Sequence, residues 1–292
     1  MTLITFGMKI LDNMENMKIY VLGASGMLGK YVSTYFKTNG FYVVDINRNK
    51  LDASNITQEV LHAKLFHLGL KKDDVIINCM GTIKPRIDAL GDLNGILVNS
   101  VFPRLLANVS EFIGSHLIHP TTDCVYSGLK GSYNEDDKYD VSDVYGMSKA
   151  MGEPSNCTVV RTSIIGEEVG QGRSLVEWIK SSANQTVNGF TNHHWNGVTC
   201  LQFAKICEQI IKTNDYWMGI KHLHSNVLDK QQLVETVSEV YGLNITVTPK
   251  ETPTKCDRSM STIHTDNLAK FNIPTLKEQI IQMKEFSTNL YA

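Results

Sequence analysis

The feature that most constrains the fold is a glycine-rich turn between a short apolar run and an amphipathic segment. Residues Lys18 to Leu22 (KIYVL) have a strand pattern, GASGMLG follows at 23–29, and a helical pattern runs from Met27 to Lys37. Glycines at such a turn allow a sharp reversal, close packing of helix on strand, and a close approach of the backbone to a pyrophosphate. The segment therefore predicts the first β-α unit of a dinucleotide-binding sheet.

The alternation of strand and helix patterns continues beyond this unit. Further β-rich runs follow at 41–44, 75–77, 117–118 and 159–160. Residues 95–112 show apolar side chains at helical spacing, and Pro103 inside this segment predicts a kink or a break. Strands that alternate with amphipathic helices are typical of βαβ units around a parallel sheet. We therefore expect an α/β fold with a Rossmann-like, doubly wound parallel sheet.

Charge and cysteine content exclude several classes of protein. The formal net charge is −2, the pI is near 6.5, and the chain has no polybasic run, so neither nucleic acid nor a membrane surface is an expected partner. The six cysteines form no C-x-x-C pair, which argues against a disulfide framework and against a zinc ribbon. A reducing, cytoplasmic setting is expected.

The glycine-rich turn also predicts a nucleotide cofactor. The N-terminus of the helix after such a turn faces the phosphates of a bound dinucleotide. After the second strand, an acidic residue would hold a ribose 2′-hydroxyl and an arginine would hold a 2′-phosphate; Asp45 and Arg48 offer both. Because a guanidinium matches phosphate geometry and keeps its charge, Arg48 favours NADPH, while Asp45 leaves NADH open as an alternative.

Three parts are expected along the chain. Residues 1–16 would be a disordered extension, because Asp12 and Glu15 interrupt their apolar start and no basic segment precedes it. Residues 17–165 would form the NADP(H)-binding Rossmann domain. Beyond them the alternation loosens, so residues 166–292 would form a smaller α/β substrate-binding region, with some segments returning to the Rossmann domain.

A second motif carries the chemistry expected of an oxidoreductase. In YGMSK, Tyr145 and Lys149 are four residues apart and so lie on one face of a helix. A lysine beside a tyrosine stabilises the phenolate and lowers the pKa of the phenol toward neutrality, so Tyr145 would exchange a proton with a substrate oxygen during hydride transfer. Thr122, in TTDCVYSG, comes where a strand ends, and strand ends line the ligand crevice of such sheets. Its hydroxyl would polarise a carbonyl oxygen.

Taken together, these motifs make the sequence resemble the extended short-chain dehydrogenase/reductases, and within them the dTDP-4-dehydrorhamnose reductase family of nucleotide-sugar 4-keto reductases. The resemblance covers residues 17–166 and thins afterwards, although DRSMST at 257–262 is similar to the family's C-terminal signature. It rests on GASGMLG (23–29), INCMG (77–81), VNSVFPRLLA (98–107), TTDCVYSGLKGSYNEDD (121–137), VYGMSKAMGE (144–153) and VVRTSIIG (159–166).

The resemblance implies roles for the residues that match. Thr122 would polarise the C4 ketone, Tyr145 would donate the proton, and Lys149 would tune Tyr145 and hold the nicotinamide ribose. Asn99 falls on a helix asparagine that supports the catalytic lysine. The implied cofactor-binding residues are Gly23, Ser25, Gly26, Met27, Leu28, Gly29, Asp45, Arg48, Asn78, Cys79, Met80, Gly81, Asn99, Tyr145, Lys149, Arg161 and Thr162.

Cys124 departs from the family pattern, which usually has an aromatic residue there. GDP-fucose synthases and the plant rhamnose-forming epimerase/reductases have a cysteine, which serves them as an acid or a base in epimerisation. The second group of that chemistry, a lysine or a histidine, has no clear counterpart: Trp178 falls near its position, with Lys180 and His193 as substitutes. Cys124 is therefore either an epimerase residue or a small apolar residue packed in place.

Further candidates concern the substrate. Lys84 follows a strand and would either approach a phosphate or lie in an exposed basic loop. Asp123, Arg173 and Trp195 would line the sugar-nucleotide region together with Thr122 and Cys124. The acidic run Glu135-Asp136-Asp137 is expected to be a solvated loop, although the resemblance leaves open a contact or an ion site at a dimer interface. The histidines lack acidic or cysteine companions at ligand spacing, so no metal is expected.

The sequence thus predicts NADPH-dependent reduction of the C4 ketone of a UDP- or dTDP-linked 4-keto-6-deoxyhexose, in deoxysugar biosynthesis for glycans. A 2-acetamido-2,6-dideoxy sugar and a coupled C3 or C3/C5 epimerisation stay open, as does a homodimer. The alternative is a non-catalytic NADP-binding regulatory subunit, since the β-subunits of methionine adenosyltransferase belong to the same family.

Overall fold

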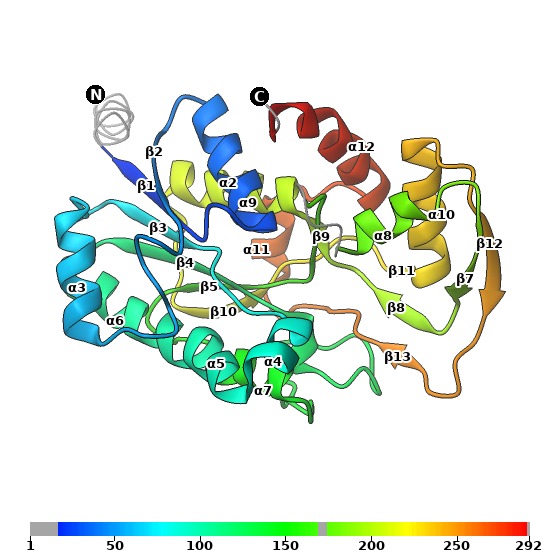
Figure 1. Ribbon diagram of the computed structural model, residues 1–292, viewed down its shortest axis with the longest axis horizontal. Helices are drawn as coiled ribbons and strands as arrows, with labels where there is room; N and C mark the ends of the chain where they lie inside the picture. Colours follow the sequence, from blue (N-terminus) through cyan, green and yellow to red (C-terminus); the bar gives the residue numbers. More distant parts are fainter. Residues whose placement is uncertain (1–16, 169–173, 291–292) are drawn as a thin grey trace.

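A six-stranded sheet forms the centre of the fold (Figure 1). The computed structural model describes residues 17–168 and 174–290, so the predictions for residues 1–16 and for Arg173 lie outside the described residues. All neighbouring strands are parallel, in the order β10-β5-β4-β3-β1-β2, which confirms the predicted α/β fold. The strands are β1 (Lys18–Leu22), β2 (Tyr42–Ile46), β3 (Val75–Asn78), β4 (His116–Thr121), β5 (Thr158–Arg161) and β10 (Gly219–His222).

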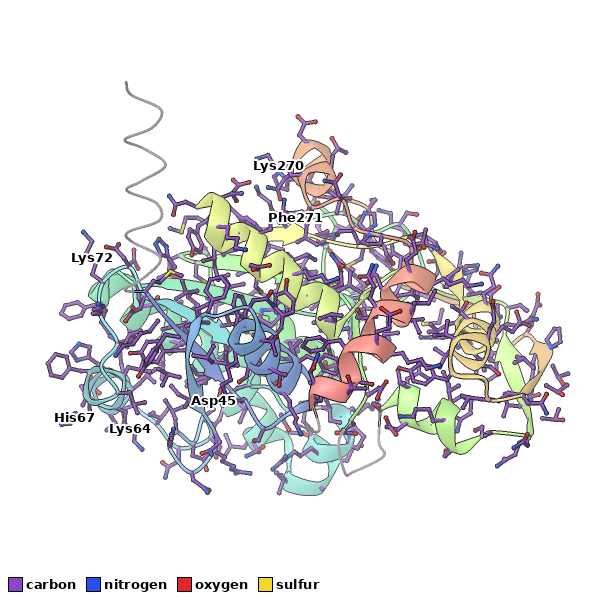
Figure 2. The ribbon with its side chains drawn as sticks, turned by 90° about the horizontal axis from the view of Figure 1, so that it is seen from above. Asp45, Lys64, His67, Lys72, Lys270 and Phe271 are labelled. Atoms are coloured by element: carbon purple, nitrogen blue, oxygen red, sulfur yellow. The ribbon has the colours of Figure 1, made fainter. Side chains whose placement is uncertain are left out.

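Helices cover both faces of this sheet because successive strand residues point to opposite sides. In β1, Ile19 and Val21 pack with α2 and α9, whereas Tyr20 and Leu22 pack with α3 and α6. Figure 2 shows α2, α9 and α12 side by side over the first face. These helices are α2 (Met27–Thr38), α3 (Gln58–His67), α6 (Phe102–Ile113), α9 (Cys200–Thr213) and α12 (Leu276–Ser287).

The chain changes direction across the sheet between β1 and β3. After β1 it moves outward to β2, and then it crosses back through α3 to β3 on the other side of β1. In open α/β sheets, ligands bind outside the carboxyl ends of the strands at such a switch point. The backbones that follow β1 and β3 are in close contact, since a Cβ on Gly23 would lie 2.9 Å from the carbonyl oxygen of Cys79.

A continuous helical run with an irregular turn lies between β3 and β4. It consists of α5 (Asp92–Ile96), the π-helical turn η1 (Leu97–Val101) and α6. The predicted disturbance at Pro103 therefore takes the form of a wide turn just before the proline, which stands in the first turn of α6. The run has the length and mean hydropathy of a membrane-spanning helix, but its inner side chains belong to the core beneath the sheet, as in any core helix.

The second half of the chain contributes to two regions. β10 is an edge strand of the main sheet, and α9 packs on one face of this sheet. By contrast, α8, α10 and α12 pack around a separate apolar cluster. Short strands in this part of the chain form three small sheets, β11-β8-β13, β12-β7 and β6-β9. The remaining elements are α4 (Lys84–Leu90), η2 (Asp123–Val125), α7 (Val144–Met151), β6 (Ile164–Ile165), α8 (Leu175–Ser181), β7 (Thr186–Phe190), β8 (His193–Trp195), β9 (Val198–Thr199), β11 (Leu228–Asp229), α10 (Lys230–Tyr241), β12 (Thr246–Lys250), β13 (Cys256–Asp257), α11 (Thr265–Lys270) and η3 (Thr288–Leu290).

Candidate functional site

The glycine-rich turn after β1 has the geometry of a phosphate cradle. Gly23 has a φ of 76°, and a Cβ on Gly29 would lie 2.1 Å from the carbonyl oxygen of Gly23, so helix and turn touch directly. Gly26 caps α2 without any side-chain hydrogen bond, which leaves the first N–H groups of the helix available. Ser25 and Gly26 are exposed. The arrangement fits the pyrophosphate of a dinucleotide.

Two of these glycines are expected to respond differently to substitution. In Gly29→Ala the new methyl group meets backbone at 2.1 Å, so the free energy of unfolding should fall by about 1–3 kcal/mol. In Gly26→Ala the methyl group meets nothing closer than 3.4 Å, so the fold should keep its stability while NADPH affinity falls at least about 10-fold. Denaturant unfolding and cofactor titration check both. Equal losses of stability in the two variants would contradict this geometry.

The two candidates after β2 have different surroundings. The carboxylate of Asp45, labelled in Figure 2, accepts a hydrogen bond from Ser33 Oγ at 2.6 Å and forms an ion pair with Lys37, both on α2. Arg48 is exposed, and among the described residues its guanidinium pairs with the carboxylate of Asp52 alone, at 3.3 Å. Exposed pairs of this kind contribute little stability. Asp45 is thus held by α2, whereas Arg48 is available to a ligand.

The residues after β3 form the next side of the site. Asn78 is buried, binds His119 Nδ1 through its amide nitrogen at 3.1 Å, and accepts a hydrogen bond from Met80 N. Cys79 continues the strand ladder by donating its N–H to Leu22, at 2.9 Å. A Cβ on Gly81 would lie 2.8 Å from the Nζ atom of Lys149, so this glycine leaves room for the ammonium.

The π-helical turn connects this side of the site to α7. Asn99, in the turn, accepts a hydrogen bond from Thr82 N and donates to Thr82 O, at 2.9 and 3.0 Å. Its amide also donates to Ser148 Oγ at 3.1 Å, and Ser100 Oγ donates to the carbonyl of Ser148 at 2.7 Å. The wide turn therefore anchors the helix that carries Tyr145 and Lys149.

The end of β4 presents Thr122, Asp123 and Cys124 in one short turn. Thr122 Oγ1 accepts a hydrogen bond from Cys124 N at 3.1 Å and donates to Asp123 Oδ1 at 3.0 Å. The Cys124 thiol also faces Asp123, at 3.6 Å. Burial, followed by the negative charge of Asp123, raises the pKa of Cys124 to about 12. The thiol is therefore protonated at neutral pH.

Tyr145 and Lys149 face this turn from α7. The helix packs tightly there, because a Cβ on Gly146 would lie 2.3 Å from the carbonyl oxygen of Cys124. The expected lowering of the Tyr145 pKa toward neutrality is wrong, because burial raises this pKa more than a hydrogen bond with the Thr122 side chain lowers it. Burial lowers the pKa of Lys149 to about 8, against the attraction of Glu153. At neutral pH, Tyr145 thus holds its proton and Lys149 stays mainly charged.

Arg161, predicted as a cofactor residue, lies in a buried polar network. Its guanidinium binds both oxygens of Glu153, at 3.0 and 2.6 Å, and each side chain is 1% exposed. It also donates to Tyr126, Tyr139 and His222, at 2.6, 2.9 and 2.9 Å. Glu153 follows α7 and Tyr126 follows η2. Because the Arg161 guanidinium binds both, it joins the helix of Tyr145 to the turn of Thr122. The guanidinium of Arg161 is therefore occupied by hydrogen bonds to other protein side chains.

The remaining predicted residues surround this centre. Lys84 begins α4 and forms an exposed ion pair at 3.9 Å with Asp143, the residue that caps α7. Thr162 is buried and its N–H donates to Thr121 at 3.3 Å. Trp195 is buried at the end of β8.

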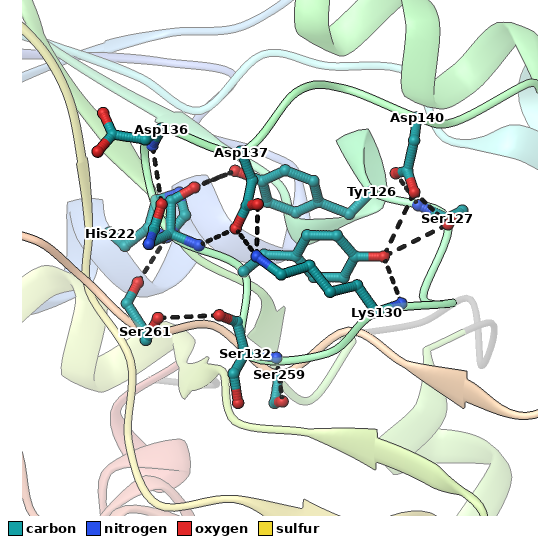
Figure 3. A network of polar contacts seen from close by, with 12 residues as sticks. Tyr126, Ser127, Lys130, Ser132, Asp136, Asp137, Asp140, His222, Ser259 and Ser261 are labelled. Carbon is teal, nitrogen blue, oxygen red and sulfur yellow. Dashed lines mark hydrogen bonds and ion pairs between the residues drawn. The ribbon is translucent and has the colours of Figure 1, made fainter.

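The segment DRSMST, at 257–262, is hydrogen-bonded to the loop that follows β4 and η2 (Figure 3). Ser132 N donates to Ser259 Oγ at 3.0 Å, one of several hydrogen bonds that Figure 3 shows. Arg258 is thereby placed against the strand end, where Nε donates to the carbonyl of Tyr126 at 2.9 Å and Nη1 contacts Cys124 Sγ at 3.6 Å. The motif was noticed in the sequence, but nothing local indicated that its arginine faces Cys124.

Glu135 contradicts the prediction of a solvated acidic loop. Its carboxylate accepts hydrogen bonds from His222 N and Thr262 Oγ1, both at 2.6 Å, and from Ile263 N at 2.9 Å. Although burial opposes it, these bonds hold the pKa of Glu135 below its usual value. For Glu135 the prediction was wrong because all three partners come from segments more than 80 residues away, whereas Asp136 is exposed as expected.

Cysteines and potential metal ligands are dispersed. All six cysteines are free thiols. Within the described ranges, 17–168 and 174–290, no three His, Cys, Asp or Glu side chains form a group that could hold a metal ion.

Comparisons with known proteins give a family match and similar folds. The family described as RmlD substrate binding domain matches residues 17–284. Spore coat polysaccharide biosynthesis protein SpsK of Bacillus subtilis (strain 168) is 26% identical over 82% of this chain and 86% of its own length. Methionine adenosyltransferase 2 subunit beta of Bos taurus is 23% identical over 79% of this chain and 74% of its own. The fold is similar to dTDP-4-dehydrorhamnose reductase from Bacillus anthracis str. Ames in complex with NADP, with a TM-score of 0.77, 17% identity, and coverage of 92% and 99% of the two chains.

Proposed function

Because this chain belongs to the RmlD substrate binding domain family, we propose that it is an NADPH-dependent reductase of the C4 ketone of a nucleotide-linked 6-deoxyhexulose. One observation carries the proposal: the Tyr145 phenol meets the Thr122 hydroxyl at the end of β4, with Lys149 one turn further along the same helix. This is a proton donor beside a carbonyl-polarising hydroxyl, placed where open α/β sheets bind ligands.

Each side chain has a defined task in the reduction. When bound, the cofactor supplies the hydride that reaches C4. Thr122, whose hydroxyl donates to Asp123 in this structure, would turn that hydroxyl to the ketone oxygen when the sugar binds, and Tyr145 gives the same oxygen its proton, which completes the alcohol. Because its pKa is raised, Tyr145 enters the reaction protonated. The Lys149 ammonium then stabilises the phenolate that forms, which needs the positive charge that a pKa of about 8 preserves at neutral pH.

The proposed cofactor is NADPH, with NADH as the alternative. The uncapped N-terminus of α2 and the exposed Gly26 fit a pyrophosphate. Asp45 is already bound by Ser33 and Lys37, which weakens it as an acceptor for a ribose 2′-hydroxyl. Arg48 has only a weak exposed partner, so its guanidinium is free for a 2′-phosphate.

Replacing Arg48 with alanine is therefore expected to change cofactor preference. KM for NADPH should rise by about 10- to 100-fold, because a charge-assisted contact to the 2′-phosphate is lost, while KM for NADH should not change. Arg86→Ala removes another exposed arginine, on α4, and should change neither value. Equal effects on NADPH and NADH would show that Arg48 does not read the 2′-phosphate.

The substrate is proposed as a UDP- or dTDP-linked 4-keto-6-deoxyhexose, including its 2-acetamido form, for glycan synthesis in the cytoplasm. Coupled epimerisation needs a base to remove a proton from C3 or C5 and an acid to return it. With a raised pKa, Cys124 is suited to return a proton and not to remove one. Lys180, the nearest substitute by sequence, is paired with Glu167 and Glu177. We therefore propose reduction as the main activity.

Incubation with NADPH and each keto-sugar in D2O tests this assignment. Loss of nicotinamide absorbance with one of the sugars would support the reductase, and deuterium at C3 or C5 of the product would add epimerisation. The second candidate function is a regulatory subunit, which the similarity to methionine adenosyltransferase 2 subunit beta favours. It predicts no turnover with any sugar and a stable stoichiometric complex with a partner protein.

A further inference from the structure

The ammonium of Lys149 lies against the protein interior without a direct counter-ion. A Cβ on Gly81 would lie 2.8 Å from its Nζ atom, so the ammonium packs on the backbone that follows β3. Among residues 17–168 and 174–290, no carboxylate forms an ion pair with Lys149. Burial accordingly lowers its pKa to about 8. A cation in such surroundings needs negative charge from a more distant group if it is to keep its proton near neutral pH.

Three ionisable side chains around Lys149 are uncharged at neutral pH. His119, on β4, is buried, and burial followed by the charge of Lys149 lowers its pKa to about 3. Cys124, in η2, is a protonated thiol because its pKa is raised to about 12, and the Asp123 carboxylate in the same turn faces this thiol at 3.6 Å. Tyr145, one turn earlier on α7, keeps its proton because burial raises its pKa. None of the three supplies negative charge to the ammonium.

One buried carboxylate does act on Lys149. Glu153 comes four residues later in the chain, just after α7. After burial, its charge has the largest effect on the pKa of Lys149, and it raises this pKa. The Glu153 side chain is 1% exposed. Its oxygens accept hydrogen bonds from Arg161 Nε and Nη2, at 3.0 and 2.6 Å, and from the Tyr139 hydroxyl, at 2.7 Å. The negative charge therefore has a fixed position relative to Lys149.

We propose that Glu153 is a positioning residue whose carboxylate keeps the Lys149 ammonium charged, while Arg161 holds the carboxylate in place. This inference rests on the proposed function, because it takes Lys149 to stabilise the phenolate of Tyr145 during reduction. The network around Arg161 then does more than join α7 to the turn of Thr122, since it also fixes the charge on which proton donation depends. Without the carboxylate, Lys149 would lose its proton at a lower pH, and the phenolate would form beside a neutral amine.

The titration of Lys149 in the full-length protein tests this role without turnover. The protein carries lysine labelled with carbon-13, and the NMR signal of Lys149 is the one that Lys149→Met removes. Wild type should titrate near pH 8. Glu153→Gln should titrate at least about one pH unit lower, because a nearby opposite charge favours the charged form. Arg161→Met, which leaves the carboxylate without its guanidinium, should titrate above wild type. Loosened packing alone would move both variants in the same direction.

Matched variants separate the charge of Glu153 from its packing. Tyr139→Phe removes one hydrogen bond to the carboxylate and no charge, so Lys149 should titrate as in wild type. Glu153→Asp keeps the charge and should titrate above Glu153→Gln. If Glu153→Gln does not fold, Arg161→Met/Glu153→Gln takes its place, because it buries no unpaired charge at this position, and it should also titrate below wild type. A wild-type titration of Lys149 in the variant without the carboxylate would overturn the proposal, as would a fall in both Glu153→Gln and Arg161→Met.

Turnover separates this inference from the proposed reductase. In wild type, kcat should fall as the pH rises past the pKa of Lys149, because only the charged form stabilises the phenolate. In Glu153→Gln this fall should begin at a lower pH, in step with the titration of Lys149. An unchanged titration in a variant that still reduces a keto-sugar refutes the role of Glu153 alone. A lowered titration in a protein that reduces no keto-sugar refutes the reductase alone.

Discussion

Replacing Tyr145 with phenylalanine is expected to lower kcat for keto-sugar reduction by about 10²- to 10⁴-fold, while NADPH still binds. The variant keeps the aromatic ring and loses only the hydroxyl that bonds with the Thr122 side chain. Without it, the ketone oxygen loses the phenol that protonates it, and the hydroxyl of Thr122 is no ready substitute because it donates to Asp123. Stopped-flow absorbance of NADPH with the preferred sugar gives kcat, and a cofactor titration gives the affinity.

The control for this prediction is Tyr42→Phe, which removes a phenol from an exposed position on β2. It should leave kcat unchanged. Lys149→Met should also lower kcat, because the phenolate would form without its neighbouring positive charge. Turnover by Tyr145→Phe at the wild-type rate would remove Tyr145 from the mechanism and leave Cys124 or a water molecule as the proton source.

Replacing Arg161 with methionine is expected to lower the free energy of unfolding by about 3–5 kcal/mol. The change leaves the Glu153 carboxylate buried without its cation, and it removes hydrogen-bond donors from Tyr126, Tyr139 and His222. Urea unfolding measures the loss. Removing Glu153 as well, in Arg161→Met/Glu153→Gln, should restore part of the stability, because no unpaired charge is then buried.

The control for the buried pair is an exposed one of similar length. Lys277 and Glu239 join α12 to α10 at 2.6 Å, but both side chains are more than half exposed. Lys277→Met should therefore change stability little. If Arg161→Met were as stable as Lys277→Met, the network around Arg161 would not hold α7 against the Thr122 turn.

The parts of the site that could be predicted from the sequence are local. A strand, a glycine turn and a helix are contiguous, so GASGMLG could be placed at the end of β1 from its neighbours alone. The spacing of Tyr145 and Lys149 likewise fixes one helix face. The position of Thr122 at the ligand crevice could be predicted because the carboxyl ends of parallel strands share one edge of the sheet.

The parts that could not be predicted depend on contacts between distant segments. Arg258 reaches Cys124 from 134 positions away, and Lys230 reaches Trp195 across an antiparallel pair of strands. Local sequence contains no signal for either contact. Glu135 was misread for the same reason, since an acidic run has the same composition whether its carboxylates meet solvent or buried N–H groups.

The proposed reductase activity is tested most directly by following the hydride. NADPH deuterated at C4 of the nicotinamide is mixed with UDP- or dTDP-4-keto-6-deoxyglucose, or with the UDP-2-acetamido analogue, and the product is examined by NMR. If the protein is the proposed reductase, we expect one reduced sugar with deuterium at C4 of the hexose, and no product with Tyr145→Phe. Bound cofactor that stays unoxidised with all three sugars would contradict it and leave the regulatory subunit as the function that the fold supports.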